Sequence, residues 1–306
     1  TLKSVLRSLC DDNGKLLCNL YNGEWTSAVD QTAQSLSDNS RFNWVAEHVR
    51  SALKTLDARG RPVPRIKEGR TPPCNDIEWL QEALASHRHV PFRVVVKKAS
   101  TIPDYVLETT KSVCINLGEL LESPLWTSPS PSVSVEREAF KMAQAVAPLL
   151  RTCRKVLFID PYLRPEWRSY QKPLLEFLRA ARRNRYTSGP DSLRLLEFHT
   201  SNKNSPVDFW DQARRHLPNN IPPGLRLRLV RWRERKNGRD FRDFHNRYIL
   251  TNHGGVAFQH GLLEKVGDTD TVTILDEPTR GELWRDFERN TSPYEYLDEL
   301  EIVGKP

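Results

Sequence analysis

Short apolar runs alternate regularly with amphipathic stretches in the second half of this sequence, and this alternation constrains the fold more than any other feature. The expected strands are residues 155–160, 193–199, 225–232, 244–250, 256–259 and 271–275. The expected helices are residues 136–150, 172–185, 207–217 and 279–289. Such alternation is typical of an α/β domain in which helices cover both faces of a sheet. We therefore expect a mixed, largely parallel sheet flanked by helices, with its first four strands as neighbours.

The Pro- and Ser-rich segment 122–135 has the composition of a linker. We expect it to separate an N-terminal domain, residues 1–121, from the α/β domain, residues 136–306. Helical periodicity over residues 27–37, 41–56 and 77–86 predicts a smaller, mainly helical or mixed N-terminal domain. This part carries no catalytic motif, and its role stays open.

Apolar segments and cysteines indicate the compartment. No apolar run approaches the roughly 20 residues that span a bilayer, and the first residues have no signal-peptide core. The five cysteines include no C-x-x-C pair, which argues against a disulfide framework and a structural zinc site. We therefore expect a cytoplasmic protein without a transmembrane segment, a metal or another cofactor.

Positive charge is concentrated in one stretch. Residues 131–263 carry 25 Lys and Arg against 12 Asp and Glu, a balance of +13, and 20 of the 25 cations are Arg. Residues 264–306 carry 5 cations against 12 acidic residues, a balance of −7. Arginine binds phosphate oxygens bidentately. This predicts a basic surface that binds a polyanion, either nucleic acid (DNA or RNA) or a phosphoinositide headgroup. The acidic tail, residues 264–306, would compete with the polyanion for this surface. The alternative is a basic face that only contacts solvent.

The segment 244–264 contains the residues that are most typical of a phosphate-binding or catalytic site. His245 and Arg247 are two residues apart in an extended run, so both side chains are expected on one face of a strand. A permanent cation can anchor a phosphoryl group while the neighbouring imidazole attacks phosphorus or moves a proton. The alternative is an ordinary surface pair.

These residues resemble the phospholipase D superfamily, whose motif is His-any-Lys, four residues and Asp. His245, Arg247 and Asn252 stand at its three spacings. Residues 245–247, 254–255 and 259–264 are more similar to a divergent branch, which includes the C-terminal domain of MIT-domain proteins and bacterial defence-associated proteins. Asp160 and the three residues after it also look like the family. The likeness covers about residues 136–306, and Arg and Asn replace the motif's Lys and Asp.

The resemblance implies a metal-independent phosphodiesterase, and we expect a nuclease of a bacterial defence or mobile-element system. His245 would form a phosphohistidine, and Arg247 would hold the non-bridging oxygens. A second imidazole, from a homodimer partner or from His199, His253 or His260 of the same chain, would protonate the leaving oxygen. Further substrate-binding candidates are Asp160, Arg231, Arg233, Arg242 and His260. Asp160, His199 and His260 have structural alternatives as a turn residue, a strand cap and a loop residue.

Two other functions stay open. One is a catalytically inactive module that binds nucleic-acid backbone or phosphoinositide headgroups. The other is a docking subunit of a larger defence complex. The retained histidine favours the enzyme, whereas the replaced Lys and Asp favour binding alone.

Overall fold

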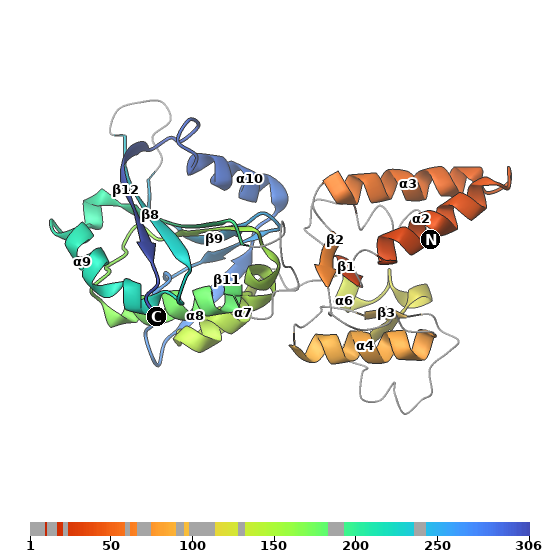
Figure 1. Cartoon of the computed structure of the whole chain (residues 1–306), viewed down its shortest axis with the longest axis horizontal. Helices are drawn as coiled ribbons and strands as arrows, with labels where there is room; N and C mark the ends of the chain where they lie inside the picture. The colour runs from red at the N-terminus through yellow and green to blue at the C-terminus, as the bar shows by residue number, and fades with distance from the viewer. Residues whose placement is uncertain are drawn as a thin grey trace. The chain divides into compact units, whose positions relative to one another are not determined.

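The computed structural model describes residues 10, 17–20, 24–58, 62–65, 75–89, 95–97, 114–127, 132–182, 193–235 and 243–306. The described residues divide into two units, one formed mainly by those up to residue 127 and the other mainly by those from residue 132 (Figure 1). Each unit is described by itself.

The N-terminal unit is mixed, with the expected helices present. Its helices are α2 (Glu24–Ser37), α3 (Asn43–Ala58), α4 (Asp76–His89), η2 (Leu117–Glu119) and α6 (Pro124–Thr127). Two small sheets pair β1 (Leu17–Leu20) with β2 (Pro62–Arg65), and β3 (Val95–Lys97) with β4 (Cys114–Asn116). Ala33, Ala46 and Val49 form a small core between α2 and α3.

The C-terminal unit is built on an eight-stranded sheet with the order β12-β8-β7-β6-β9-β10-β11-β5. Its strands are β5 (Ser132–Glu136), β6 (Lys155–Ile159), β7 (Leu195–Ser201), β8 (Arg226–Arg233), β9 (Arg247–Thr251), β10 (Gly255–Phe258), β11 (Thr269–Ile274) and β12 (Glu295–Val303). Its helices are α7 (Ala139–Thr152), α8 (Arg168–Arg182), α9 (Phe209–His216) and α10 (Glu277–Asp286), with short turns η4 (Asn202–Asn204) and η5 (Pro218–Asn220).

The expected mixed sheet flanked by helices is confirmed, and β8, β7, β6 and β9 are neighbours as predicted. Within this eight-stranded sheet, β6 with β7 and β7 with β8 are the parallel pairs. The remaining pairings in this sheet are antiparallel, so the expectation of a largely parallel sheet holds only for its centre. The pairing of β9 with β10 is antiparallel because a tight turn at residues 252–254 reverses the chain between them.

Each face of this sheet buries its own hydrophobic core. Strand residues such as Phe158 and Ile249 pack with α7 and α8 on one face. Leu157 and Trp232 pack on the other face with residues of α10 and the segment after it. The two layers of helices lie on opposite sides of the sheet in Figure 1. We refer to these as the α8 face and the α10 face.

Two segments have regular structure that the sequence did not indicate. Residues 124–127 and 132–136, within the segment expected to be a linker, form α6 and β5. The acidic segment 295–303 forms the edge strand β12, which pairs antiparallel with β8. Four acidic residues in nine hide its strand periodicity.

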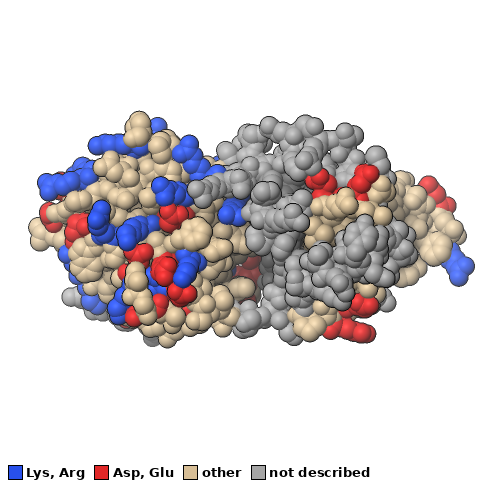
Figure 2. All heavy atoms as spheres, turned by 90° about the horizontal axis from the view of Figure 1, so that it is seen from below, with Lys and Arg blue, Asp and Glu red and all other residues tan. Residues whose placement is uncertain are grey.

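The acidic strand β12 neutralises the basic strand β8. Arg226 pairs with Glu301 at 2.6 Å, and Arg231 pairs with Asp298 at 2.5 Å. Arg233 lies 3.3 Å from Glu295. Lys and Arg side chains are interspersed with Asp and Glu over the C-terminal unit on the face drawn in Figure 2. The acidic tail therefore does act as the internal competitor, and β8 contributes no open row of arginines.

Candidate functional site

Asp160 lies directly after β6 and is fully buried. Its backbone N–H donates to the carbonyl of His199 at 3.1 Å. Its carboxylate accepts hydrogen bonds from the backbone N–H groups of Tyr162 and Leu262, both at 2.9 Å. Since Pro161 follows and cannot extend the strand pairing, the chain turns here. Asp160 therefore ties the end of β6 to the distant loop around Leu262.

Burial raises the pKa of Asp160, while its backbone hydrogen bonds and the charge of Arg247 act in the opposite direction. The Tyr170 hydroxyl hydrogen-bonds this carboxyl group. Burial, reinforced by the negative charge of Asp160, raises the pKa of Tyr170, so its phenol stays protonated at neutral pH. The environment of Asp160 is thus a dry hydrogen-bonded cluster beside one cation.

Arg247, the first residue of β9, is this cation. Its guanidinium carbon lies 4.6 Å from the ring centroid of Tyr162, a cation–π arrangement. Its Nε is buried and has no hydrogen-bond partner among the described residues. A buried donor of this kind is costly unless another group satisfies it. Arg247 therefore lies beside the buried Asp160 with one donor that the described residues leave unsatisfied.

Gly261 brings the loop close to this pair. Its φ of +110° lies in the region that L side chains rarely adopt. A Cβ there would lie 3.1 Å from Oδ2 of Asp160 and 3.6 Å from Nε of Arg247. The glycine thus allows the backbone both an unusual dihedral angle and a close approach to the two charged side chains.

His245 is exposed at the rim of this cluster, two residues before β9 begins. Its Nδ1 lies 2.6 Å from the hydroxyl oxygen of Tyr162, and the two rings are nearly perpendicular at 89°. Phe244, buried at the preceding position, anchors the segment in the core of the α10 face. Tyr162 therefore touches both predicted residues: its hydroxyl meets His245, and its ring face meets Arg247.

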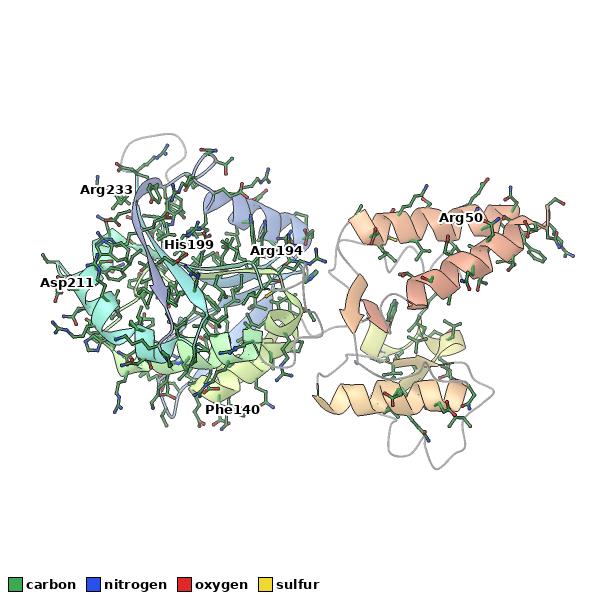
Figure 3. All side chains as sticks on the ribbon, viewed as in Figure 1. Arg50, Phe140, Arg194, His199, Asp211 and Arg233 are labelled. Atoms are coloured by element: carbon green, nitrogen blue, oxygen red, sulfur yellow. The ribbon has the colours of Figure 1, made fainter. Side chains whose placement is uncertain are left out.

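His199 lies on the opposite side of the sheet. Ile159 pairs in register with both His199 and Tyr248, so these three side chains lie on the α10 face. Asp160 and Arg247 are each one residue away from this register, so their side chains lie on the α8 face. Trp232 Nε1 donates to His199 Nδ1 at 2.9 Å, and Nε2 lies 3.3 Å from Glu197. Since an indole N–H only donates, Nδ1 is the acceptor and Nε2 carries the proton. His199 is therefore a buried imidazole with a partner for each ring nitrogen, on the face of the sheet opposite Asp160 and Arg247. Figure 3 shows it within the C-terminal unit.

Two further predicted residues are engaged elsewhere, and a third lies outside the described residues. Arg231 forms a bidentate pair with Asp298 and stacks 4.6 Å from the Trp210 ring. Arg233 pairs with Glu295 as described above. Arg242 lies outside the described residues.

The two remaining predicted residues lie in turns. The Asn252 side chain accepts hydrogen bonds from the backbone N–H groups of Arg154 at 2.7 Å and Lys155 at 3.1 Å, at the opposite end of β9 from Arg247. His260 precedes Gly261, and its ring lies 3.3 Å from Asp270. Of the sequence candidates, the structure brings together His245, Arg247 and Asp160.

Sequence reasoning missed Tyr162, Tyr170 and Gly261. Tyr162 lay within the family-like segment after Asp160, which was the available signal. Nothing in the sequence indicates that Tyr170, in the first turn of α8, reaches the same carboxylate.

Among the residues that the structure describes, no group of three or more His, Cys, Asp or Glu side chains could hold a metal ion. Within the same residues, no helix is both long and apolar enough to cross a membrane.

No protein-family model matches the sequence, and no curated protein matches it. One similar solved structure is the phospholipase D family member Nuc from Salmonella typhimurium, with a TM-score of 0.34 and 9% identity, over 54% of this chain and 97% of that one. Another is TrmBL2, an archaeal chromatin protein described as showing a novel mode of DNA binding, with a TM-score of 0.28 and 13% identity, over 82% of this chain and 83% of that one. Both TM-scores are too low to carry an argument about this chain.

Proposed function

We propose that the C-terminal unit binds a phosphodiester of a nucleic acid at Arg247 and His245, and cleaves it when two copies of the chain bring two imidazoles to one phosphate. The observation that carries this proposal is the double contact of Tyr162, which holds a cation and an exposed imidazole side by side. The expected setting in a defence or mobile-element system rests on the sequence resemblance alone.

The chemistry follows from these contacts. Arg247 donates hydrogen bonds to the non-bridging oxygens and compensates their charge. For Nε2 of His245 to attack phosphorus, Nε2 must be unprotonated. Nδ1 then carries the proton and donates a hydrogen bond to the Tyr162 oxygen. Attack forms a P–N bond and breaks a P–O bond, and the leaving oxygen takes a proton from the second imidazole. Water then hydrolyses the phosphohistidine, which restores His245.

A second copy supplies the second imidazole because the chain's other described candidates are engaged. His199 is buried on the α10 face, and His260 is paired with Asp270. His253 lies in the turn at the far end of β9. A homodimer with two His245 side chains at one phosphate completes the acid–base pair without a metal.

The direct test is incubation of end-labelled DNA and RNA with the full chain in the presence of a chelator. We expect cleavage by the wild type, no cleavage but near-normal binding by His245→Ala, and loss of both by Arg247→Ala. His216→Ala and Arg215→Ala, on α9, are matched controls and should behave as the wild type. Binding that is indifferent to Arg247→Ala would overturn the proposal.

The dimer is tested by mixing unfolded wild type with unfolded His245→Ala and refolding the mixture. If each phosphate needs two His245 side chains, activity falls as the square of the wild-type fraction. A linear fall would mean that one copy is sufficient.

A binding module without turnover is the second candidate, favoured by His199, which is held in the core by Trp232, and by Asn252, which is tied to the start of β6. This module predicts that Arg247→Ala abolishes binding, that His245→Ala is mild, and that no product forms. Vesicles with phosphoinositides, assayed beside the oligonucleotides, identify its ligand.

A further inference from the structure

His260 lies in the loop after β10, close to the cluster of Asp160 and Arg247. A Cβ on the next residue, Gly261, would stand 3.6 Å from Nε of Arg247. Because consecutive Cα atoms are about 3.8 Å apart, the Cα of His260 lies within roughly 9 Å of that nitrogen. The His260 side chain is 52% exposed. A ligand that extends beyond one phosphate at Arg247 therefore meets the surroundings of an accessible imidazole.

The backbone of His260 is held from two sides. Its N–H and that of Gln259 donate to the Asp270 carboxylate at 3.1 and 3.0 Å. Its carbonyl accepts a hydrogen bond at 3.4 Å from Nη2 of the buried Arg137, which also donates to the carbonyl of Leu263 at 3.3 Å. These contacts preorganise the loop, so the position of the imidazole does not depend on a ligand.

Asp270 determines which ring nitrogen of His260 carries the proton. Its side chain is fully buried, and its Oδ1 lies 3.3 Å from Nδ1 of His260. The carboxylate also accepts the two backbone N–H groups, and an ionised carboxylate only accepts hydrogen bonds. In the neutral imidazole, Nδ1 therefore carries the proton and Nε2 is an acceptor.

This acceptor is available to a ligand. Among the residues that the structure describes, no hydrogen bond reaches Nε2 of His260. The same tautomer has no proton on Nε2 to give to a leaving oxygen, which agrees with a second copy of the chain as the source of the acid. His260 thus has a different task from His245.

A neutral acceptor beside a phosphate site discriminates between nucleic acids. The sugar–phosphate backbone of DNA presents oxygens that only accept hydrogen bonds. Each ribose of RNA adds a 2′-hydroxyl, which can donate, and this group lets a protein distinguish RNA from DNA at a given site. A bound RNA backbone can therefore satisfy Nε2 of His260, whereas a bound DNA backbone cannot.

We propose that His260, oriented by Asp270, recognises RNA by accepting a hydrogen bond at Nε2 from the 2′-hydroxyl of a ribose next to the bound phosphate. The inference rests on the function proposed for Arg247 and His245, and it narrows the substrate class from nucleic acid to RNA. Because the contact joins the protein to the ribose, the preference does not depend on base sequence.

The probes are RNA, DNA and 2′-fluoro RNA oligonucleotides of one sequence. Their Kd values are measured by fluorescence anisotropy with the full chain, in the His245→Ala background so that the probes stay intact, with a chelator and at one fixed salt concentration. RNA should bind about fivefold more tightly than DNA, because one hydrogen bond is gained. The 2′-fluoro group keeps the sugar pucker of RNA but cannot donate, so this probe should bind like DNA.

His260→Phe keeps a ring and removes the acceptor. In this variant the ratio of the Kd values for DNA and RNA should fall from about five to about one. His216→Phe, on α9, is the matched control and should keep the ratio. NMR of the ¹⁵N-labelled His260 ring needs no substitution at this position: Nδ1 should carry the proton, and the Nε2 signal should shift with RNA and not with DNA.

The outcomes separate this inference from the function on which it rests. Equal affinity for RNA and DNA, both dependent on Arg247, would overturn the inference and leave the phosphodiester site standing. A preference for RNA that survives His260→Phe, or that 2′-fluoro RNA retains, would overturn it as well. Binding of neither nucleic acid, or of phosphoinositide vesicles alone, would overturn both proposals.

Discussion

The hydroxyl oxygen of Tyr162 lies 2.6 Å from Nδ1 of His245, while the ring of the same tyrosine lies 4.6 Å from the Arg247 guanidinium carbon. One side chain thereby performs two separable tasks, because the hydroxyl acts on the imidazole and the ring face acts on the cation. Substitutions at this position can remove the first task and retain the second.

Tyr162→Phe should therefore lower turnover about tenfold while the Kd for an oligonucleotide changes less than about threefold, since a hydrogen bond of about 1 kcal/mol is lost and the ring remains. Tyr162→Leu should weaken binding as well. The tautomer of His245, followed by ¹⁵N NMR of the imidazole, should shift in both variants. An unchanged imidazole signal in Tyr162→Phe would mean that the contact does not orient His245.

Asp160 predicts a pH dependence of stability. Because burial raises its folded-state pKa, the folded protein holds a proton that the unfolded chain releases. The free energy of unfolding from this group should therefore fall as pH rises from the usual carboxyl range through the folded-state pKa. Urea unfolding of the wild type and of Asp160→Asn at a series of pH values measures this dependence. The amount by which the wild type exceeds Asp160→Asn in free energy of unfolding should shrink as pH rises. A difference that grows with pH would mean that the Arg247 charge and the hydrogen bonds outweigh burial.

Gly261→Ala should destabilise the protein and disturb the site together. Its φ of +110° and the 3.1 Å approach to Asp160 both oppose a Cβ. The backbone effect alone is about 1–3 kcal/mol. Gly267→Ala is a matched control, because Gly267 has a φ of +91° and nothing within 4 Å of its Cβ position. Thermal melts should show a larger loss for Gly261→Ala, and only that variant should lose oligonucleotide binding.

Asp298→Asn should reveal how β12 restrains β8. The hydrogen bonds of Arg231 hold the pKa of Asp298 below its usual value. The ionised Asp298 therefore stabilises the folded protein above the ordinary carboxyl range, and this stabilisation is lost as pH falls through the folded-state pKa. The pair is partly exposed, so the substitution should cost about 1–2 kcal/mol at neutral pH. Non-specific binding to DNA should strengthen, because Arg231 is freed. Unchanged affinity for DNA would mean that Arg231 is inaccessible even without its partner.

Periodicity predicted the four central strands and the helices around them because each buries a regular apolar face. It failed at β12, where the acidic residues suit an edge strand beside arginines but conceal the alternation. This failure also made Arg231 and Arg233 look available for a substrate.

The grouping of side chains at the candidate site was expected in part. Asp160 stands at a strand end as expected, but His245 does not share a strand with Arg247, because β9 begins at Arg247 and His245 lies two residues before it. His199 was placed at the same edge but on the wrong face, because alternation within β6 and within β7 does not reveal their mutual register. Ile159 pairs with His199, and that offset of one residue turns the imidazole away from Asp160.

The pairing of β12 with β8 also bears on what polyanions do to the unfolded chain. The β8 arginines have their carboxylate partners only while the sheet is formed, so unfolding releases several cations at once. Unfolding frees the paired carboxylates as well and leaves the net charge unchanged, but it makes the β8 arginines individually available to a flexible polyanion. A ligand that prefers the unfolded state lowers apparent stability. A flexible polyanion such as heparin would thus depress the Tm, whereas a short phosphodiester seated at Arg247 would raise it.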